Sequence, residues 1–354
     1  MKKFRKFLIK FFIMIAVGTG ITFGILKAVD HWLYKISQSS YLEVETYRTG
    51  GEVTLKDEDI IEIPDGAEQL QFSYNNKYYA YLENGSIHIH TIDDKKEYCV
   101  VTDNNPICYF YMLYDKNLLM YFTQEGDGSY STITLKTFEI ATQRSTLYND
   151  FDVRNFSRIK DITMSPLVNI IYINVETKSG VSTNNTIYKI DLFNSMSQVR
   201  SGSIISRIRM LQHVDRLYYG DTNGGVYTAG ATVNYLFGYA DVELIGINSN
   251  LANADDSEKQ YYLDTQTHDK VYIVSAGNLI DTLYLSDSDI VTTYNEYGDV
   301  YLVYPTYILK ITGKNPYKRI AKLSKYVKFE AIKGDTVYLR TSNNKIITTK
   351  LLDN

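Results

Sequence analysis

The chain has 354 residues, of which 44% are hydrophobic, 22% are charged and 14% are aromatic, and its formal net charge at pH 7 is −4. These fractions are ordinary for a folded protein and exclude disordered, collagen-like and low-complexity chains. Tyrosine is over-represented, with 33 residues against 14 Phe and one Trp. Because tyrosine combines strand propensity with an apolar body and a polar tip, this excess favours β structure with many half-exposed faces.

The first 35 residues differ from the rest of the chain. Residues 1–10 form a basic tail, and Phe11–Leu26 contains no charged residue. Together with Phe7–Ile9, the apolar stretch is about twenty residues long, which suffices to cross a hydrocarbon core of about 30 Å. We therefore predict a cytoplasmic tail, a transmembrane signal anchor at residues 11–35 and an extracellular remainder. A cleaved signal peptide is the alternative, although no clear small-x-small site ends the apolar stretch.

The distribution of charge supports this division. Residues 1–35 contain seven basic residues and one acidic residue, a net charge of +6, whereas residues 36–354 contain 30 basic and 40 acidic residues, a net charge of −10. Nucleic-acid binding needs a basic surface, so we expect no nucleic-acid partner. Residues 36–58 carry few helix or core signals and are interpreted as a tether.

From residue 59 onward, one aromatic-rich phrase recurs, beginning at residues 77, 117, 169, 216, 260, 299 and 335. A short strand precedes each phrase, and a polar hairpin and an alternating strand follow it, as in Glu83-Asn84-Gly85-Ser86 and Ile87–His90. Units of about 40–50 residues with four strands are typical of β-propellers. The sequence predicts an all-β, seven-bladed β-propeller of four-stranded antiparallel blades over residues 59–354. Six or eight blades, or a pair of sandwiches, are alternatives.

The two ends of this region complement each other. The last unit lacks an outer strand, because the chain ends soon after Ile346–Leu352, whereas residues 59–63 form a spare strand before the first unit. We predict that this N-terminal strand completes the last blade and closes the ring, since an open ring would leave blade faces exposed to water.

The repeat spacing and strand pattern resemble those of bacterial seven-bladed β-propellers of the YVTN or TolB-like kind, and the resemblance covers about residues 59–354. Motifs for an activated serine, a phosphate-binding loop, a dinucleotide fold or a zinc protease do not occur. The sequence therefore names no reaction and no catalytic residue, and we expect no cofactor.

Two groups of residues are candidates for ligand binding. Arg207 and Arg209 lie two apart on a predicted innermost strand, so their guanidinium groups share one face. If that face lines the central channel, it would bind an anionic group; if it lies between blades, the arginines would pair with acids of the next blade. Both interpretations remain open.

The second group lies in a predicted insertion, Asn248–Lys259, which carries Asp255, Asp256 and Glu258. Insertions in repeat proteins map to loops on one face and often to binding surfaces. A tolerated, solvated loop is the alternative.

Two further pairs have more than one interpretation. His88 and His90 share one face of a predicted strand and could hold a metal ion with a third ligand such as Glu83 or Asp93. A polar strand face explains them more simply, so no metal site is predicted. Cys99 and Cys108 are either joined in a disulfide or are two small buried residues.

These observations lead to two possible functions. The first is a membrane-anchored, extracytoplasmic β-propeller that acts as a protein–protein interaction or scaffold module of a cell-envelope assembly; its many tyrosines would suit an interface. The alternative is a glycan-binding or glycan-cleaving hydrolase or lyase at the cell wall, with paired carboxylates at the channel mouth. We favour binding, with an envelope protein or cell-wall glycan as the partner.

Overall fold

The computed structural model describes Lys27 and then residues 60–165, 167–203, 205–211, 214–221, 226–229, 234–235, 242–248, 259–264, 269–275, 278–285, 291–294, 300–304, 307–311, 318–322, 327–333, 336–341 and 345–350. The predicted tail, the tether and all of the predicted anchor except Lys27 lie outside these residues. In the part of the chain described, we find no helix with the length and apolarity needed to cross a membrane.

All described strands belong to one compact unit, Glu52–Asn354, and form seven four-stranded antiparallel sheets. The first three sheets consist of β2 (Glu68–Phe72), β3 (Tyr78–Glu83), β4 (Ser86–Thr91) and β5 (Glu97–Val101); β6 (Ile107–Met112), β7 (Leu118–Gly126), β8 (Tyr130–Glu139) and β9 (Arg144–Arg154); and β10 (Phe156–Ser165), β11 (Ile170–Ser179), β12 (Ser182–Ile190) and β13 (Met196–Ser203).

The next three sheets consist of β14 (Ile205–Met210), β15 (Leu217–Asp221), β16 (Val226–Ala229) and β17 (Asn234–Tyr235); β18 (Val242–Asn248), β19 (Lys259–Asp264), β20 (Lys270–Ser275) and β21 (Asn278–Tyr284); and β22 (Val291–Tyr294), β23 (Val300–Val303), β24 (Tyr307–Lys310) and β25 (Lys318–Lys322). The last sheet combines both ends of the unit: β26 (Val327–Lys333), β27 (Thr336–Thr341), β28 (Lys345–Lys350) and β1 (Ile60–Glu62).

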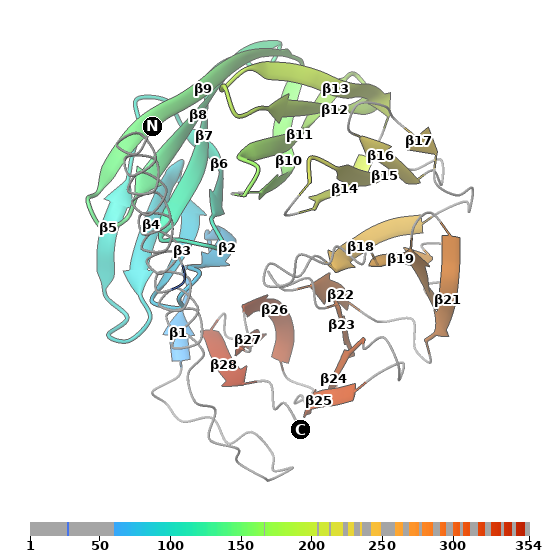
Figure 1. Cartoon of the computed structure of the whole chain (residues 1–354). Coiled ribbons are helices and arrows are strands. Elements are labelled where there is room, and N and C mark those ends of the chain that lie inside the picture. Colours follow the sequence, from blue (N-terminus) through green and yellow to red (C-terminus); the bar gives the residue numbers. More distant parts are fainter. Residues whose placement is uncertain are drawn as a thin grey trace, which may run out of the picture. The chain divides into compact units, whose positions relative to one another are not determined.

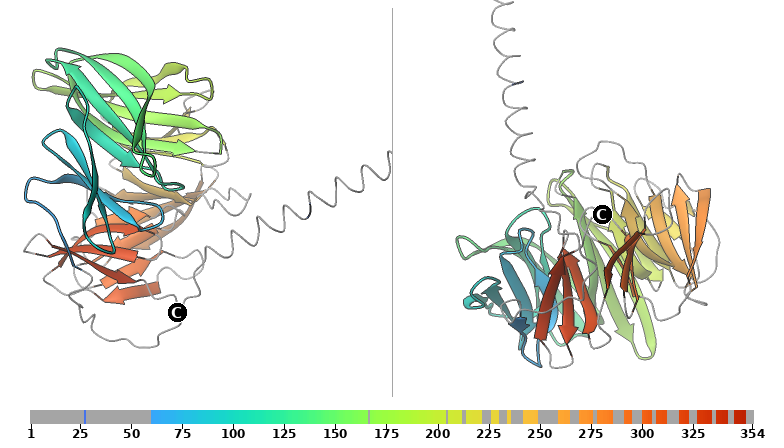
Figure 2. Two further views of the ribbon diagram at one scale, coloured as in Figure 1. Left: turned by 90° about the vertical axis from the view of Figure 1, so that its left-hand side faces the viewer. Right: turned by 90° about the horizontal axis from the view of Figure 1, so that it is seen from below.

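The sheets stand side by side around a common axis, with the first strand of each repeat innermost (Figure 1). Neighbouring innermost strands contact each other in sequence order from β2 to β26, and the side views show the sheets packed face to face (Figure 2). The predicted β-propeller of four-stranded antiparallel blades is confirmed, and β2, β6 and β10 are the strands expected just before the phrases that begin at residues 77, 117 and 169.

The N-terminal strand pairs with the C-terminal strand, as the sequence predicts. β1 runs antiparallel to β28, with Ile60 opposite Ile347 and Glu62 opposite Lys345. Ile61 is 2% exposed and belongs to an apolar cluster shared by the last and first sheets. In this cluster the rings of Phe72 and Tyr338 stack at 3.4 Å between centroids. We call the boundary between these two sheets the closing seam.

Seven tyrosines are more deeply buried than the composition suggests. The second strand of every sheet buries a tyrosine: Tyr79, Tyr121, Tyr172, Tyr219, Tyr262, Tyr301 and Tyr338. Several of their hydroxyls reach polar groups outside their own strand. Tyr172 donates to Asp215 of the following sheet at 2.6 Å, and Tyr338 donates to Asn76 across the closing seam at 3.0 Å. Tyr172 and Tyr338 therefore join neighbouring blades through their hydroxyl groups.

We expect the closing seam to limit stability. Replacing Ile61 with Ala removes a buried side chain from the shared cluster and should lower the free energy of unfolding by about 2–4 kcal/mol, measured by urea denaturation. Glu62→Ala changes the neighbouring exposed residue and serves as the control, with little expected effect. Equal unfolding midpoints for Ile61→Ala and the wild type would contradict a stabilising role for β1.

Candidate functional site

The innermost strands carry polar side chains that bind the backbone of the next sheet. Gln71 on β2 donates from Nε2 to the Phe110 carbonyl of β6 at 2.8 Å and accepts from the Met112 amide at 2.8 Å. Gln69 accepts from the Phe110 amide at 3.1 Å. Side-chain amides thus take the place of a strand ladder between neighbouring blades and satisfy edge groups that would otherwise need water.

A similar contact between neighbouring blades involves Arg209, one of the two arginines that the sequence offers as ligand-binding candidates. Asp161 on β10 accepts from the Ile208 amide of β14 at 3.1 Å and pairs with Arg209 Nη1 at 2.8 Å. The side chain of Arg209 is 12% exposed. Arg209 therefore pairs with an acid of the adjacent blade, here the preceding one, which favours the interpretation of a contact between blades. Arg207 is half-buried on the same strand, and anion binding by this pair stays a prediction.

The second predicted binding group, and an acidic residue of the last innermost strand, add no support for ligand binding. Asp255, Asp256 and Glu258 lie outside the described residues. Glu330, on the innermost strand β26, accepts two hydrogen bonds from Arg340 of β27, at 2.7 Å and 2.9 Å. The Glu330 carboxylate is therefore bonded within its own sheet.

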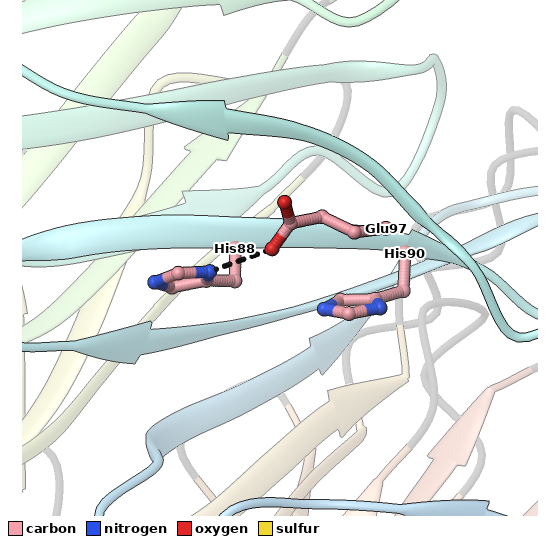
Figure 3. A group of neighbouring side chains, drawn as sticks. All are labelled: His88, His90 and Glu97. Carbon is pink, nitrogen blue, oxygen red and sulfur yellow. Dashed lines mark hydrogen bonds and ion pairs between the residues drawn. The ribbon is translucent and has the colours of Figure 1, made fainter.

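A histidine cluster lies on the first sheet, at its closing-seam face. His88 and His90 lie on β4, and Glu97 begins β5 (Figure 3). One ligand atom from each of the three side chains lies within 4.8 Å of the others. His88 Nδ1 is 3.0 Å from Glu97 Oε2, and His88 Nε2 is 3.9 Å from Glu83 Oε2. We call His88, His90 and Glu97 the histidine cluster.

Two tyrosines of β3 support the histidine rings. Tyr81 stacks on His88 at 5.3 Å and on His90 at 5.4 Å between centroids, and Tyr79 stacks on His90 at 5.0 Å. The Tyr81 hydroxyl lies 3.2 Å from His90 Nε2. Packing and this contact together therefore set the orientations of the rings. Burial also lowers the pKa of His90, because desolvation disfavours the imidazolium form.

The sequence indicated the two histidines as possible ligands, with Glu83 or Asp93 as the third, but it did not indicate Glu97. Glu83 does lie near His88, but the structure brings Glu97, rather than Asp93, into the cluster. A register shift in the β4–β5 ladder causes this: His88 lies opposite Val100, whereas His90 lies opposite Glu97. Val100 and Glu97 are three apart, so regular alternation would place them on opposite faces. The bulge moves Glu97 to the histidine face, and residue spacing alone cannot reveal it.

The two cysteines are free thiols in this structure. Cys99 packs against the apolar cluster between the first and second sheets, and Cys108 against the one between the second and third. Burial raises the pKa of Cys99 to about 11 and that of Cys108 to about 12. Of the two interpretations left open, the structure therefore supports small, partly buried residues.

An apolar patch lies where the second and third sheets meet on the outside. It consists of Leu147 on β9 and of Leu192 and Phe193 in the β12–β13 turn, which are 60%, 60% and 85% exposed. Two contacts hold the patch in place. Asp191 Oδ1 accepts from the Phe193 amide at 2.9 Å, and Asn149 Nδ2 donates to the Asn194 carbonyl at 2.9 Å. Leu192 and Phe193 are thus presented by a well-bonded turn; we call these two residues and Leu147 the seam patch.

Comparisons with known proteins identify the fold but no family. No protein-family model matches the chain, and no curated protein matches it either. Among solved structures, a chain of the Mitotic Checkpoint Complex has a TM-score of 0.56 at 11% identity, over 88% of this chain and 100% of that one. The AfRom2 CNH domain has a TM-score of 0.51 at 11% identity, over 84% and 98%.

A third structure, Hsv2 of Kluyvelomyces marxianus, has a TM-score of 0.50 at 9% identity, over 81% of this chain and 97% of that chain. Identities this low show a shared architecture and no more. The chain is a β-propeller, a fold often used as a scaffold for protein–protein interaction.

We expect the glutamine bridge between the first two sheets to be stabilising. In Gln71→Leu, the Phe110 carbonyl and the Met112 amide lose a partner in a partly buried boundary, and this should lower the free energy of unfolding by about 1–3 kcal/mol in urea denaturation. The matched control is Gln198→Leu, at an exposed position on β13, which should have little effect. Indistinguishable midpoints for the two variants would contradict the bridge.

Proposed function

We propose that this protein is a seven-bladed β-propeller that is held at a bacterial cell membrane by its N-terminal segment and serves as a protein–protein interaction scaffold in a cell-envelope assembly. The seven four-stranded sheets and the β1–β28 pairing support the blade number. The sequence supports the anchor, because a basic tail precedes an uncharged stretch of membrane-spanning length.

The observation that carries the interaction role is the seam patch. Three large apolar side chains lie on the two sheets that meet here, two of them in one turn, and each is at least 60% exposed. Isolated surface apolar residues need no explanation, but grouped ones held in an ordered turn are typical of contact sites. Asp191 fixes the turn through the amides of Phe193 and Ser195, both at 2.9 Å. Binding would therefore cost little ordering of the backbone.

The position of the patch also fits a scaffold. It is contributed by β9, the outer strand of one sheet, and by the turn before β13, the outer strand of the next. A partner that covers both sheets would contact two blades at once and would leave the innermost strands untouched. Another envelope protein is the partner class that we propose for this surface.

The anchor is tested by fractionating cells that express the full chain. We expect the wild type to remain in the membrane pellet after alkaline carbonate extraction, and the propeller to be digested by protease added to intact cells. Ile15→Lys with Val17→Lys should release the chain, since each lysine at a helix centre costs about 2.5–3.5 kcal/mol. The matched variant Ile15→Leu with Val17→Leu should behave as wild type. Extraction of the wild type into the supernatant would contradict the anchor.

The interaction role is tested by in vivo cross-linking and mass spectrometry from native membranes. Leu192→Ser with Phe193→Ser should reduce recovery of the partner at least about tenfold, because exposed aromatic anchors dominate interface energies. Leu279→Ser with Ile280→Ser removes two other exposed apolar residues, which are 42% and 51% exposed on β21. This control should recover the partner as the wild type does. Equal recovery with both double variants would exclude the seam patch as the interface.

A further inference from the structure

The histidine cluster has the composition and spacing of a metal site. Two imidazoles and one carboxylate, with an open fourth position, form a common ligand set for zinc in proteins. Tetrahedral coordination at about 2.0–2.2 Å places ligand atoms about 3.3 Å apart. His88 Nδ1 and Glu97 Oε2 are 3.0 Å apart, and the whole set lies within 4.8 Å. The third ligand would have to move closer for coordination.

The backbone places these side chains together through a bulge. Without the register shift between Ile89 and His90, the residue opposite His90 would be Tyr98 rather than Glu97. Instead, Tyr98 contacts Tyr78, which packs against the apolar cluster on the opposite face of the sheet. Bulges of this kind re-aim a side chain at the cost of ladder hydrogen bonds. Here the residue that is re-aimed is a carboxylate, and it is directed at two imidazoles.

The surrounding residues fit the second layer of a metal site. Ligating histidines usually donate their other ring N–H to a carboxylate or another acceptor. With His88 ligating through Nδ1, its proton would lie on Nε2, which is 3.9 Å from Glu83 Oε2. The carboxylate would need to approach by a few tenths of an ångström to accept a hydrogen bond from it. The Tyr81 ring stacks on both histidines and limits their rotation. The same contacts that orient the rings would thus orient metal ligands.

Charge and access also suit a cation. Glu83 and Glu97 place two carboxylates beside imidazoles that are neutral in their ligating form, so a divalent ion would balance the local charge. The side chains of His88, Glu83 and Glu97 are 22%, 26% and 49% exposed. The cluster is therefore open to solvent on one side, which gives an ion a path to it and leaves room for water as a fourth ligand.

We propose that His88, His90 and Glu97 bind one divalent transition-metal ion of the zinc class, with Glu83 as the carboxylate that orients His88. The site lies on the first sheet, beside the closing seam. It is independent of the interaction role proposed for the seam patch, on the far side of the second sheet.

The test uses the full chain, free of affinity tags and stripped of metal with a chelator. Titration with ZnCl₂ in a calorimeter should show one Zn²⁺ bound per chain, and Co²⁺ should give the visible absorption bands of four- or five-coordinate cobalt. His90→Gln and Glu97→Gln should each weaken Zn²⁺ binding by about a hundredfold or more. Glu83→Gln should weaken it by about 10–100-fold, as expected for an orienting carboxylate.

Matched controls separate this site from histidine binding in general. His268→Gln removes a histidine elsewhere in the chain and should leave Zn²⁺ affinity and the cobalt spectrum unchanged. Circular dichroism verifies folding, and Glu97→Gln serves as a second test if His90→Gln misfolds, since Glu97 is half exposed at the start of its strand. Sub-stoichiometric binding by the wild type, or equal affinity of the wild type, His90→Gln and Glu97→Gln, would overturn the proposal.

Discussion

Ring closure is the constraint on which this propeller depends. Each four-stranded sheet has two faces to cover, and in a ring each neighbour covers one of them. The two ends of the described β-propeller are joined by the pairing of β1 with β28. The stacked rings of Phe72 and Tyr338 and the hydrogen bond from Tyr338 to Asn76 reinforce it. Loss of these contacts would expose one face of two sheets at once.

A second requirement operates near the axis, where each innermost strand has an edge with no strand beside it. The structure satisfies part of this edge with side chains of the preceding blade: Gln71 bonds the backbone of β6, and Asp161 bonds the backbone of β14. Polar residues on innermost strands can therefore be structural, even where their position suggests a ligand. Arg209 illustrates this, because its charge is used by Asp161.

Much of the fold could be predicted from the sequence, because the repeat is visible in local patterns. Hairpin turns such as Asn84-Gly85 and the recurring aromatic strands reveal the sheets, and the spare strand at residues 59–63 reveals the closure. The candidate sites were harder to predict from the sequence. The partner of Arg209 lies 48 residues away, and Glu97 joins the histidines only through a bulge. The expectation of half-exposed tyrosines also failed for the second strands, since composition cannot tell whether a hydroxyl will find an internal partner such as Asp215.

The pairing of β1 with β28 also sets an order of events during synthesis. Glu62 leaves the ribosome about 280 residues before Lys345, its partner in the ladder. At about 5–20 residues per second, the first strand waits roughly 15 to 60 s for the last. Throughout that time its edge and the uncovered side of the neighbouring sheet face solvent, where strand edges attract other chains. The nascent protein thus passes through a vulnerable interval whose length is fixed by topology, and any chaperone that assists it would have to protect its earliest strand until translation ends.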